Sequence, residues 1–87
     1  MSEEIQPIGQ ITHFFDRISV AVVHLWQPLA VGDWIHVYGT TTNFVQQVES
    51  MQIDNAPIAD GLPEQDIAVQ VGSKVRNGDL IYPYVPE

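Results

Sequence analysis

The chain has 87 residues and contains no cysteine, few basic residues and no long apolar run. The absence of cysteine excludes disulfide bonds, thiolate zinc sites and a cysteine nucleophile. No apolar run approaches the roughly 18 residues that a membrane-spanning helix needs. The first residues, 1–4, are acidic, whereas a signal peptide starts with basic residues. We therefore expect a cytoplasmic protein with no membrane partner.

The scarcity of positive charge also limits the partners. Three basic residues, Arg17, Lys74 and Arg76, stand against 11 acidic ones, and the formal net charge is −8. Nucleic acids and anionic membranes are bound largely by Lys and Arg that contact phosphates. We therefore expect no DNA partner. The same charge disfavours RNA, which stays open as an alternative partner.

The length suits a single domain, and 45% hydrophobic residues is ordinary for a globular protein. Pro7 ends a short polar stretch at the beginning of the chain. We expect an N-terminal lead over residues 1–7 and one domain over residues 8–87.

Short extended segments, rich in β-branched and aromatic residues, make up most of the chain. They cover residues 8–15, 18–25, 34–38, 40–54, 67–71 and 80–85. No stretch of about ten or more residues has apolar side chains spaced with the period of a helix. Short strands separated by turns are typical of an all-β sandwich or barrel. Because closure removes exposed sheet edges, we predict an all-β fold, a small closed six-stranded β-barrel.

The fourth extended segment changes phase along its length. Its apolar residues Phe44 and Val48 share one parity, whereas Met51 and Ile53 share the other. A strand cannot exchange its two faces without a bulge or bend. We therefore predict a bulge near residues 49–50.

Prolines and glycines mark two further places. Residues 55–64 contain Pro57, Gly61 and Pro63, which predicts a loop. Pro83 lies in the last extended segment, where proline indicates an edge strand or a strand end.

A Gly-Asp corner followed by an apolar strand occurs twice, at Gly32-Asp33 and at Gly78-Asp79. Glycine adopts positive φ angles without strain, and an Asp side chain can accept hydrogen bonds from nearby backbone N–H groups. We predict two equivalent turns at these corners.

The third extended segment alternates clearly between its two faces. Ile35 and Val37 point one way and are predicted to enter the core, whereas Trp34, His36 and Tyr38 point the other way. An outward aromatic row suits recognition of a partner, so these three residues form the candidate binding surface. The alternative is cross-strand packing, or cover by the N-terminal segment.

The second extended segment is apolar on both faces. One face carries Ile18, Val20 and Val22, and the other carries Ala21, Val23 and Leu25. A strand of this kind needs cover on its second side. The cover is either a loop or a partner, and we expect a protein partner or a homodimer.

Side chains suited to catalysis or metal binding occur without a motif. His13 and His24 can approach each other across the first hairpin, and imidazole is a common zinc ligand, but the spacing matches no known ligand pattern. Ser19, Ser50 and Ser73 stand in no G-x-S-x-G elbow. We therefore predict no enzyme activity, no catalytic residue, no cofactor and no metal site.

Four runs carry a family resemblance through their order and spacing. They are GQIT at residues 9–12, LAVGDWIHVYG at 29–39, VESM at 48–51 and VRNGDLI at 75–81. Together they resemble the second domain of translational GTPases such as elongation factor Tu. The runs at 40–44 and 48–52 are more similar still to small translation elongation factor-like proteins. They also resemble the barrel appended to enzymes of the collagenase-like peptidase family, some of which are linked to RNA hydroxylation.

The resemblance implies a barrel of the translation-protein domain 2 type and a non-catalytic binding or adaptor module. It does not imply GTPase activity, because the chain lacks the G-x-x-x-x-G-K-[ST] loop that holds phosphates. The acidic positions that serve tRNA binding in the GTPases fall at Gln52 and Gln65, so that site is not carried over. The alternative function is an accessory subunit of a collagenase-like peptidase or an RNA-hydroxylation type enzyme.

Overall fold

A computed structural model of the chain describes residues 5–86. Over that range it contains β-strands joined by turns and loops, and no helix. The strands are β1 (Gly9–Phe15), β2 (Val20–Leu25), β3 (Leu29–Ala30), β4 (Trp34–Tyr38), β5 (Asn43–Gln47), β6 (Met51–Ile53), β7 (Ala56–Ile58), β8 (Asp60–Gly61), β9 (Asp66–Gln70) and β10 (Leu80–Pro83). The all-β prediction is confirmed. Among residues 5–86 there is no helix with the length and apolarity to cross a membrane.

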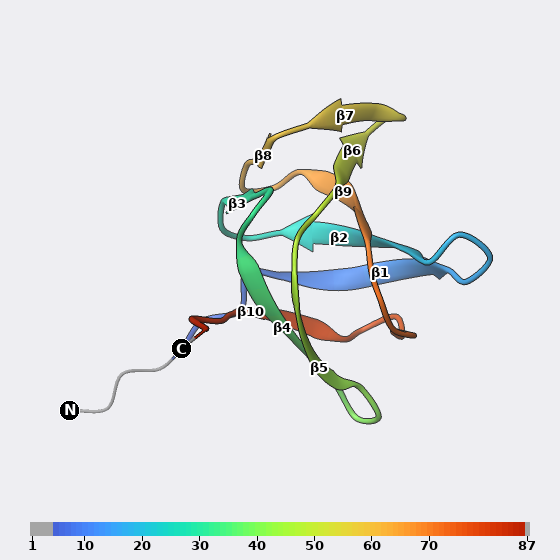
Figure 1. Cartoon of the computed structure of the whole chain (residues 1–87), viewed down its shortest axis with the longest axis vertical. Coiled ribbons are helices and arrows are strands. Elements are labelled where there is room, and N and C mark those ends of the chain that lie inside the picture. The colour runs from blue at the N-terminus through green and yellow to red at the C-terminus, as the bar shows by residue number, and fades with distance from the viewer. Residues whose placement is uncertain (1–4, 87) are drawn as a thin grey trace.

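The main sheet is antiparallel and has the order β5-β4-β10-β1-β2-β9-β6-β7. β5 and β6 are the two halves of one extended stretch, separated only by residues 48–50. Because β5 pairs with β4 and β6 pairs with β9, this stretch joins the two ends of the sheet. The sheet therefore curls into a barrel of six strands, namely β1, β2, β4, β5–β6, β9 and β10 (Figure 1). The barrel prediction is confirmed.

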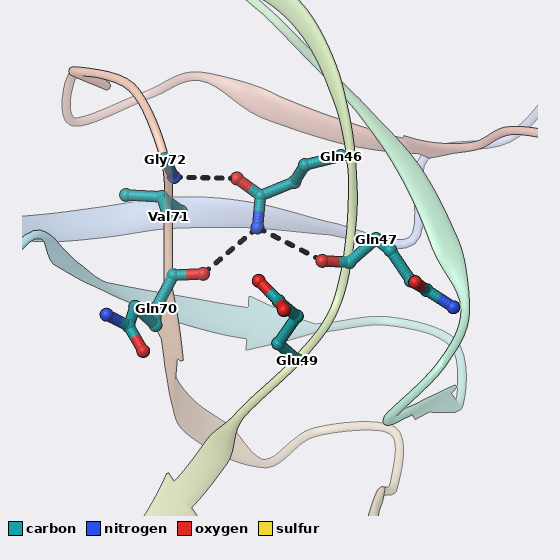
Figure 2. Close-up of a pocket in the computed structure, with 6 residues that line it drawn as sticks. All are labelled: Gln46, Gln47, Glu49, Gln70, Val71 and Gly72. Carbon is teal, nitrogen blue, oxygen red and sulfur yellow. Dashed lines mark hydrogen bonds between the residues drawn. The ribbon is translucent and has the colours of Figure 1, made fainter.

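A glutamine side chain closes the barrel where β5 and β9 diverge (Figure 2). Gln46 Oε1 accepts a hydrogen bond from the Gly72 N–H at 2.8 Å, and Gln46 Nε2 donates to the Gln70 carbonyl at 3.0 Å. The amide of this side chain thus satisfies backbone groups that a paired strand would otherwise satisfy. Toward β6 the backbone pairing resumes, because the Gln70 N–H donates to the Ser50 carbonyl at 3.3 Å.

The predicted phase change lies between β5 and β6. Val48 and Met51 are both buried, although their positions have opposite parity. At this break Val48 exchanges backbone hydrogen bonds with the corner of the preceding turn: its carbonyl accepts from the Gly32 N–H, and its N–H donates to the Asp33 carbonyl. The irregularity at residues 48–50 therefore lets both halves of the stretch face the core, as predicted.

The core lies inside the barrel and takes residues from every barrel strand. Its buried members are Ile8, Ile11, Ala21, Val23, Leu25, Leu29, Ile35, Val37, Val48, Met51, Ile67, Val69, Val71, Val75 and Ile81. Each large aliphatic side chain among them stabilises the fold by roughly 1.5–3 kcal/mol relative to its exposure to water. This interior is filled by side chains, so the outer face of the barrel is the surface available for function.

The two Gly-Asp corners form the same turn. Gly32 has φ 100° and Gly78 has φ 99°, the left-handed conformation that glycine tolerates. In the first corner the Asp33 N–H donates to the Ala30 carbonyl, and Asp33 Oδ2 accepts from the Ala30 N–H at 2.9 Å. Asp79 makes the corresponding pair of hydrogen bonds with the backbone of Arg76. The prediction of equivalent turns is confirmed.

The loop predicted for residues 55–64 is wrong, because this stretch contains β7 and β8. Asp54 and Asn55 have φ angles of 51° and 66°, and they connect β6 to β7 as a two-residue hairpin. Asn and Asp are the residues besides glycine that enter this conformation most readily, so they supply the turn. Pro57 is accommodated because β7 is the last strand of the sheet.

The last strand ends at Pro83, and β10 lies between β1 and β4. Pro83 therefore marks a strand end, and the alternative of an edge strand is excluded. β2 also lies inside the sheet, between β1 and β9. Its outward Val20 and Val22 are half-buried, whereas Ile18 lies in the preceding turn and is exposed. Cross-strand neighbours thus provide part of the cover that this strand requires.

Candidate functional site

β4 places the candidate binding surface on the outside of the barrel. Ile35 and Val37 are completely buried, so the pleat turns Trp34, His36 and Tyr38 outward. Trp34 is 37% exposed and Tyr38 is 50% exposed, whereas His36 is half-buried. The structure thus puts the three residues on the predicted face.

The neighbouring strand β10 extends this surface with two tyrosines. Tyr82 lies directly opposite His36 in the antiparallel register, and Tyr84 follows the strand end. The two tyrosines line an open groove of about 400 Å³ together with His36 and Tyr38 of β4 and with Ile5 and Pro83. We call it the aromatic groove, and its residues are Ile5, His36, Tyr38, Tyr82, Pro83 and Tyr84. Trp34 lies at the end of the same face but does not line the groove.

Hydrogen bonding fixes the floor of the aromatic groove. The His36 ring donates from Nε2 to Asn43 Oδ1 at 2.6 Å, because an amide oxygen can only accept. The same ring lies against that of Tyr38, with centroids 5.7 Å apart and planes at 59°. The hydrogen bond therefore holds the ring of His36, against which the ring of Tyr38 packs.

A second, larger cleft of about 660 Å³ adjoins the groove and shares Tyr38 and Tyr82 with it. It lies between the turn after β4 and the turn before β10. Its other lining residues include Thr40, Thr41 and Arg76, so it adds hydroxyl groups and one cation. Asp79 also lines this cleft, so the aromatic groove has a polar rim with one cation and one carboxylate on this side.

Gly39 allows the two turns of this cleft to meet. A Cβ at Gly39 would collide with the side-chain carboxylate of Asp79. Asp79 is buried, and its carboxylate is engaged with the backbone N–H of Arg76. The carboxylate therefore serves the turn, and Arg76 is the charged group that the cleft presents.

The histidines of the first hairpin are not brought together as a pair. His13 lies opposite Val22 and its ring packs on Phe15, with centroids 4.3 Å apart. His24 lies opposite Gln10 of β1, but its ring is hydrogen-bonded to Asp66 of β9, the strand on the other side of β2. In the described part of the chain, no three His, Asp or Glu side chains are grouped as metal ligands would be.

His24 forms the two ion-pair contacts found among the described residues, one with Asp66 and one with Glu64. Its Nδ1 is 2.9 Å from Asp66 Oδ1 and its Nε2 is 3.3 Å from Glu64 Oε2. The hydrogen bond to Asp66 raises the pKa of His24 above its ordinary value of 6.5, against a smaller lowering by partial desolvation, and Glu64 adds to the rise. This arrangement ties β2 to β9 and to the loop before it.

The side-chain partners of the histidine rings are carboxylates and one amide, not serine hydroxyls. Ser19 lies in the turn between β1 and β2, and Ser50 lies at the break before β6. A Ser nucleophile needs a base within hydrogen-bonding reach. Among residues 5–86, no hydrogen bond joins a serine hydroxyl to a histidine ring.

Sequence reasoning missed the contributions of Ile5, Tyr82 and Tyr84 to the candidate surface. It also missed Gln46, which lines a polar hollow of about 380 Å³ at the barrel seam with Gln70 and Gly72. The alternation in the last extended segment could have placed Tyr82 outward. The contributions of Ile5 and Tyr84 depend on how residues from distant parts of the chain lie together in space, which no local pattern indicates.

Comparison with known proteins links the chain to peptidases. It is 36% identical over 76 residues to an uncharacterised protease of Methanocaldococcus jannaschii. The match covers 86% of the chain but only 19% of that protease, so the chain spans about a fifth of the length of the curated relative. No family model matches the chain.

Two crystal structures share the fold. Both are of the C-terminal domain of a Geobacillus thermoleovorans protein described as a U32 peptidase, one of them as a selenomethionine variant. The selenomethionine structure has a TM-score of 0.84 over 88% of this chain and 98% of that one. The other has a TM-score of 0.87 over 92% and 93%. Sequence identity is 16% in each, so these likenesses show the fold.

Proposed function

We propose that the chain is a non-catalytic barrel module of a collagenase-like peptidase, and that it binds the catalytic part of that enzyme. The observation that carries the proposal is the 36% identity to a protease of which the chain spans only 19%. The larger part of that protease lies outside the match and has room for the catalytic machinery. The likeness to the C-terminal domain of a U32 peptidase supports the same role.

The chemistry of the described residues supports a binding role. The ring of His24 is hydrogen-bonded to Asp66 and Glu64, and the ring of His36 to Asn43. Hydrolysis of a peptide bond needs an activated nucleophile or a metal-bound water. A barrel whose polar side chains serve turns and strand pairing is suited to hold and orient an enzyme.

A translation role is not proposed. The resemblance to elongation factors rests on short runs of sequence, whereas the curated relative and the two solved structures are peptidases or parts of them. The net charge of −8 also favours a protein partner over RNA.

Purification of the tagged chain from its own organism tests this function. We expect mass spectrometry to identify a collagenase-like peptidase in constant ratio to the chain, and we expect the isolated chain to hydrolyse neither gelatin nor casein. Hydrolysis by the isolated chain would contradict the non-catalytic role. Recovery of the chain without any such peptidase would contradict the accessory role.

A further inference from the structure

We propose that the aromatic groove is the surface on which the peptidase part docks. This inference rests on the proposed function and adds the face of the barrel that makes the contact. The groove lies on the outer faces of β4 and β10 and is lined by Ile5, His36, Tyr38, Tyr82, Pro83 and Tyr84.

The first support is the chemistry of the groove. Ile5 is 67% exposed, Tyr38 50% and Tyr84 41%, so a large apolar area faces water. Tyrosines contribute large contact areas at a small loss of side-chain entropy, and their hydroxyl groups tolerate either environment. The six lining residues include no acid, although the chain has 11. A partner can therefore cover this face without removing water from carboxylates.

The second support is the position of the first and last segments of the barrel domain, residues 5–8 and 83–84 (Figure 1). The Ile8 N–H donates to the Ile81 carbonyl of β10, and the Tyr84 N–H donates to the Trp34 carbonyl of β4. Residues 5–8 and 83–84 thus run beside the groove. In the two solved structures the barrel is a C-terminal domain, so the rest of the peptidase precedes it. With the same fold, a preceding domain emerges next to this groove, which favours the peptidase over a second barrel as its occupant.

The third support is that the groove is preorganised. β4 and β10 are both paired on two sides within the sheet. The hydrogen bond from His36 to Asn43 and the packing of His36 on Tyr38 fix the floor. A rigid surface loses little entropy on binding. The adjoining cleft with Arg76 supplies the charged rim that protein interfaces commonly have.

Single substitutions in the groove test the proposal. Tyr38→Glu and Tyr84→Glu each place a charge on the apolar surface. Phe15→Glu is the matched control, because Phe15 is 46% exposed and ends β1 at the β1–β2 hairpin, which lies away from residues 5–8 and 83–84 (Figure 1). Tagged variants are expressed in the native organism, and the ratio of peptidase to barrel is measured by mass spectrometry. Circular dichroism and thermal unfolding of each variant check that it is folded.

We expect each groove variant to recover at least about tenfold less peptidase than the wild type, as is usual for aromatic anchors in an interface. We expect Phe15→Glu to recover as much as the wild type, and Tyr38→Phe to retain most of the binding. Folded groove variants that recover the peptidase fully would overturn the docking surface while leaving the proposed function intact. A wild-type chain that recovers no peptidase overturns both. Loss of a barrel dimer, with recovery of peptidase unchanged, would assign the groove to a second copy.

Discussion

At the scale of single residues, three side-chain arrangements hold the barrel in shape: an amide that bridges strands, a glycine beside a buried carboxylate and a histidine between two acids. The amide bridges two strands that are not paired there, the glycine lets two turns approach each other, and the histidine links β2 to β9 and to the loop before it. Their loss has consequences that differ in size and in pH dependence, and each can be measured on the isolated chain.

Gln46→Leu is expected to destabilise the fold by roughly 0.5–1.5 kcal/mol for each hydrogen bond lost, because the exposed Gly72 N–H and Gln70 carbonyl exchange their present partner for water. Gln46→Glu keeps the shape of the side chain and the acceptor for the Gly72 N–H. It replaces the Nε2 donor by an oxygen that faces the Gln70 carbonyl, so we expect a comparable loss of stability. Gln52→Leu, at an exposed position of β6, serves as the control. Urea unfolding measures all three, and equal stability of the variants would contradict the bridging role.

Gly39→Ala is expected to cost about 1–3 kcal/mol, since the new methyl group collides with the carboxylate of Asp79. Gly72→Ala is the matched control, because the nearest atom to a Cβ there is 3.8 Å away. Thermal unfolding of the two variants provides the comparison. If Gly39→Ala were as stable as Gly72→Ala, the close approach of the two turns would be wrong.

The ion pair of His24 predicts a pH dependence of stability. Its pKa is raised in the fold, so its contribution is complete below pH 6.5 and is lost as the pH rises through the raised pKa. Asp66→Asn removes the largest cause of the rise and should bring the pKa of His24 back toward 6.5 by more than Glu64→Gln does. NMR titration of the ring measures the pKa of His24. An unchanged pKa in Asp66→Asn would contradict the assignment.

At the scale of elements, much of the barrel can be predicted from the sequence. The alternation of Ile35 and Val37 with polar and aromatic neighbours fixes which face of β4 is buried, and both residues are completely buried. The phase change before Met51 places the bend in the long strand, and the Gly-Asp pairs place two turns. These features depend on neighbours in the sequence, so local patterns are sufficient to find them.

Other elements depend on contacts between distant parts of the chain. Gln46 meets Gln70 across 24 positions, so no local pattern assigns its bridging role. β8 forms only by pairing with β3, across some thirty residues of intervening chain. The aromatic groove likewise requires Ile5 and Tyr84, from opposite ends of the chain, to lie together. The sequence predicted the part of the surface that one strand carries, and the fold supplied the remainder.

The pairing of the strands predicts which elements open first. β7 pairs only with β6, whereas β2 pairs on both sides with β1 and β9. We expect the backbone amides of β7 to exchange with deuterium at least about tenfold faster than those in the middle of β2, because edge elements open without global unfolding. Hydrogen exchange followed by NMR gives the rates. Equal protection of the two strands would show that β7 opens only with the whole barrel.

At the scale of the whole molecule, charge and shape separate two regions. No carboxylate of the described residues lines the aromatic groove, whereas the adjoining cleft is lined by Arg76 and by the buried Asp79. An acidic protein whose aromatic groove is lined by no carboxylate of the described residues is suited to bind a larger enzyme through that groove. The proposed function therefore belongs to one outer surface of the barrel and not to its interior, which is filled by core side chains.

The most direct measurement places a photoreactive phenylalanine analogue at position 38 or, as a control, at position 15, in the chain expressed in its own organism. After illumination, mass spectrometry identifies what is joined to each position. If the aromatic groove is the docking surface, we expect covalent products between position 38 and a collagenase-like peptidase, and none between position 15 and that enzyme. Products at position 38 that contain RNA, a second copy of the chain or an unrelated protein would contradict it.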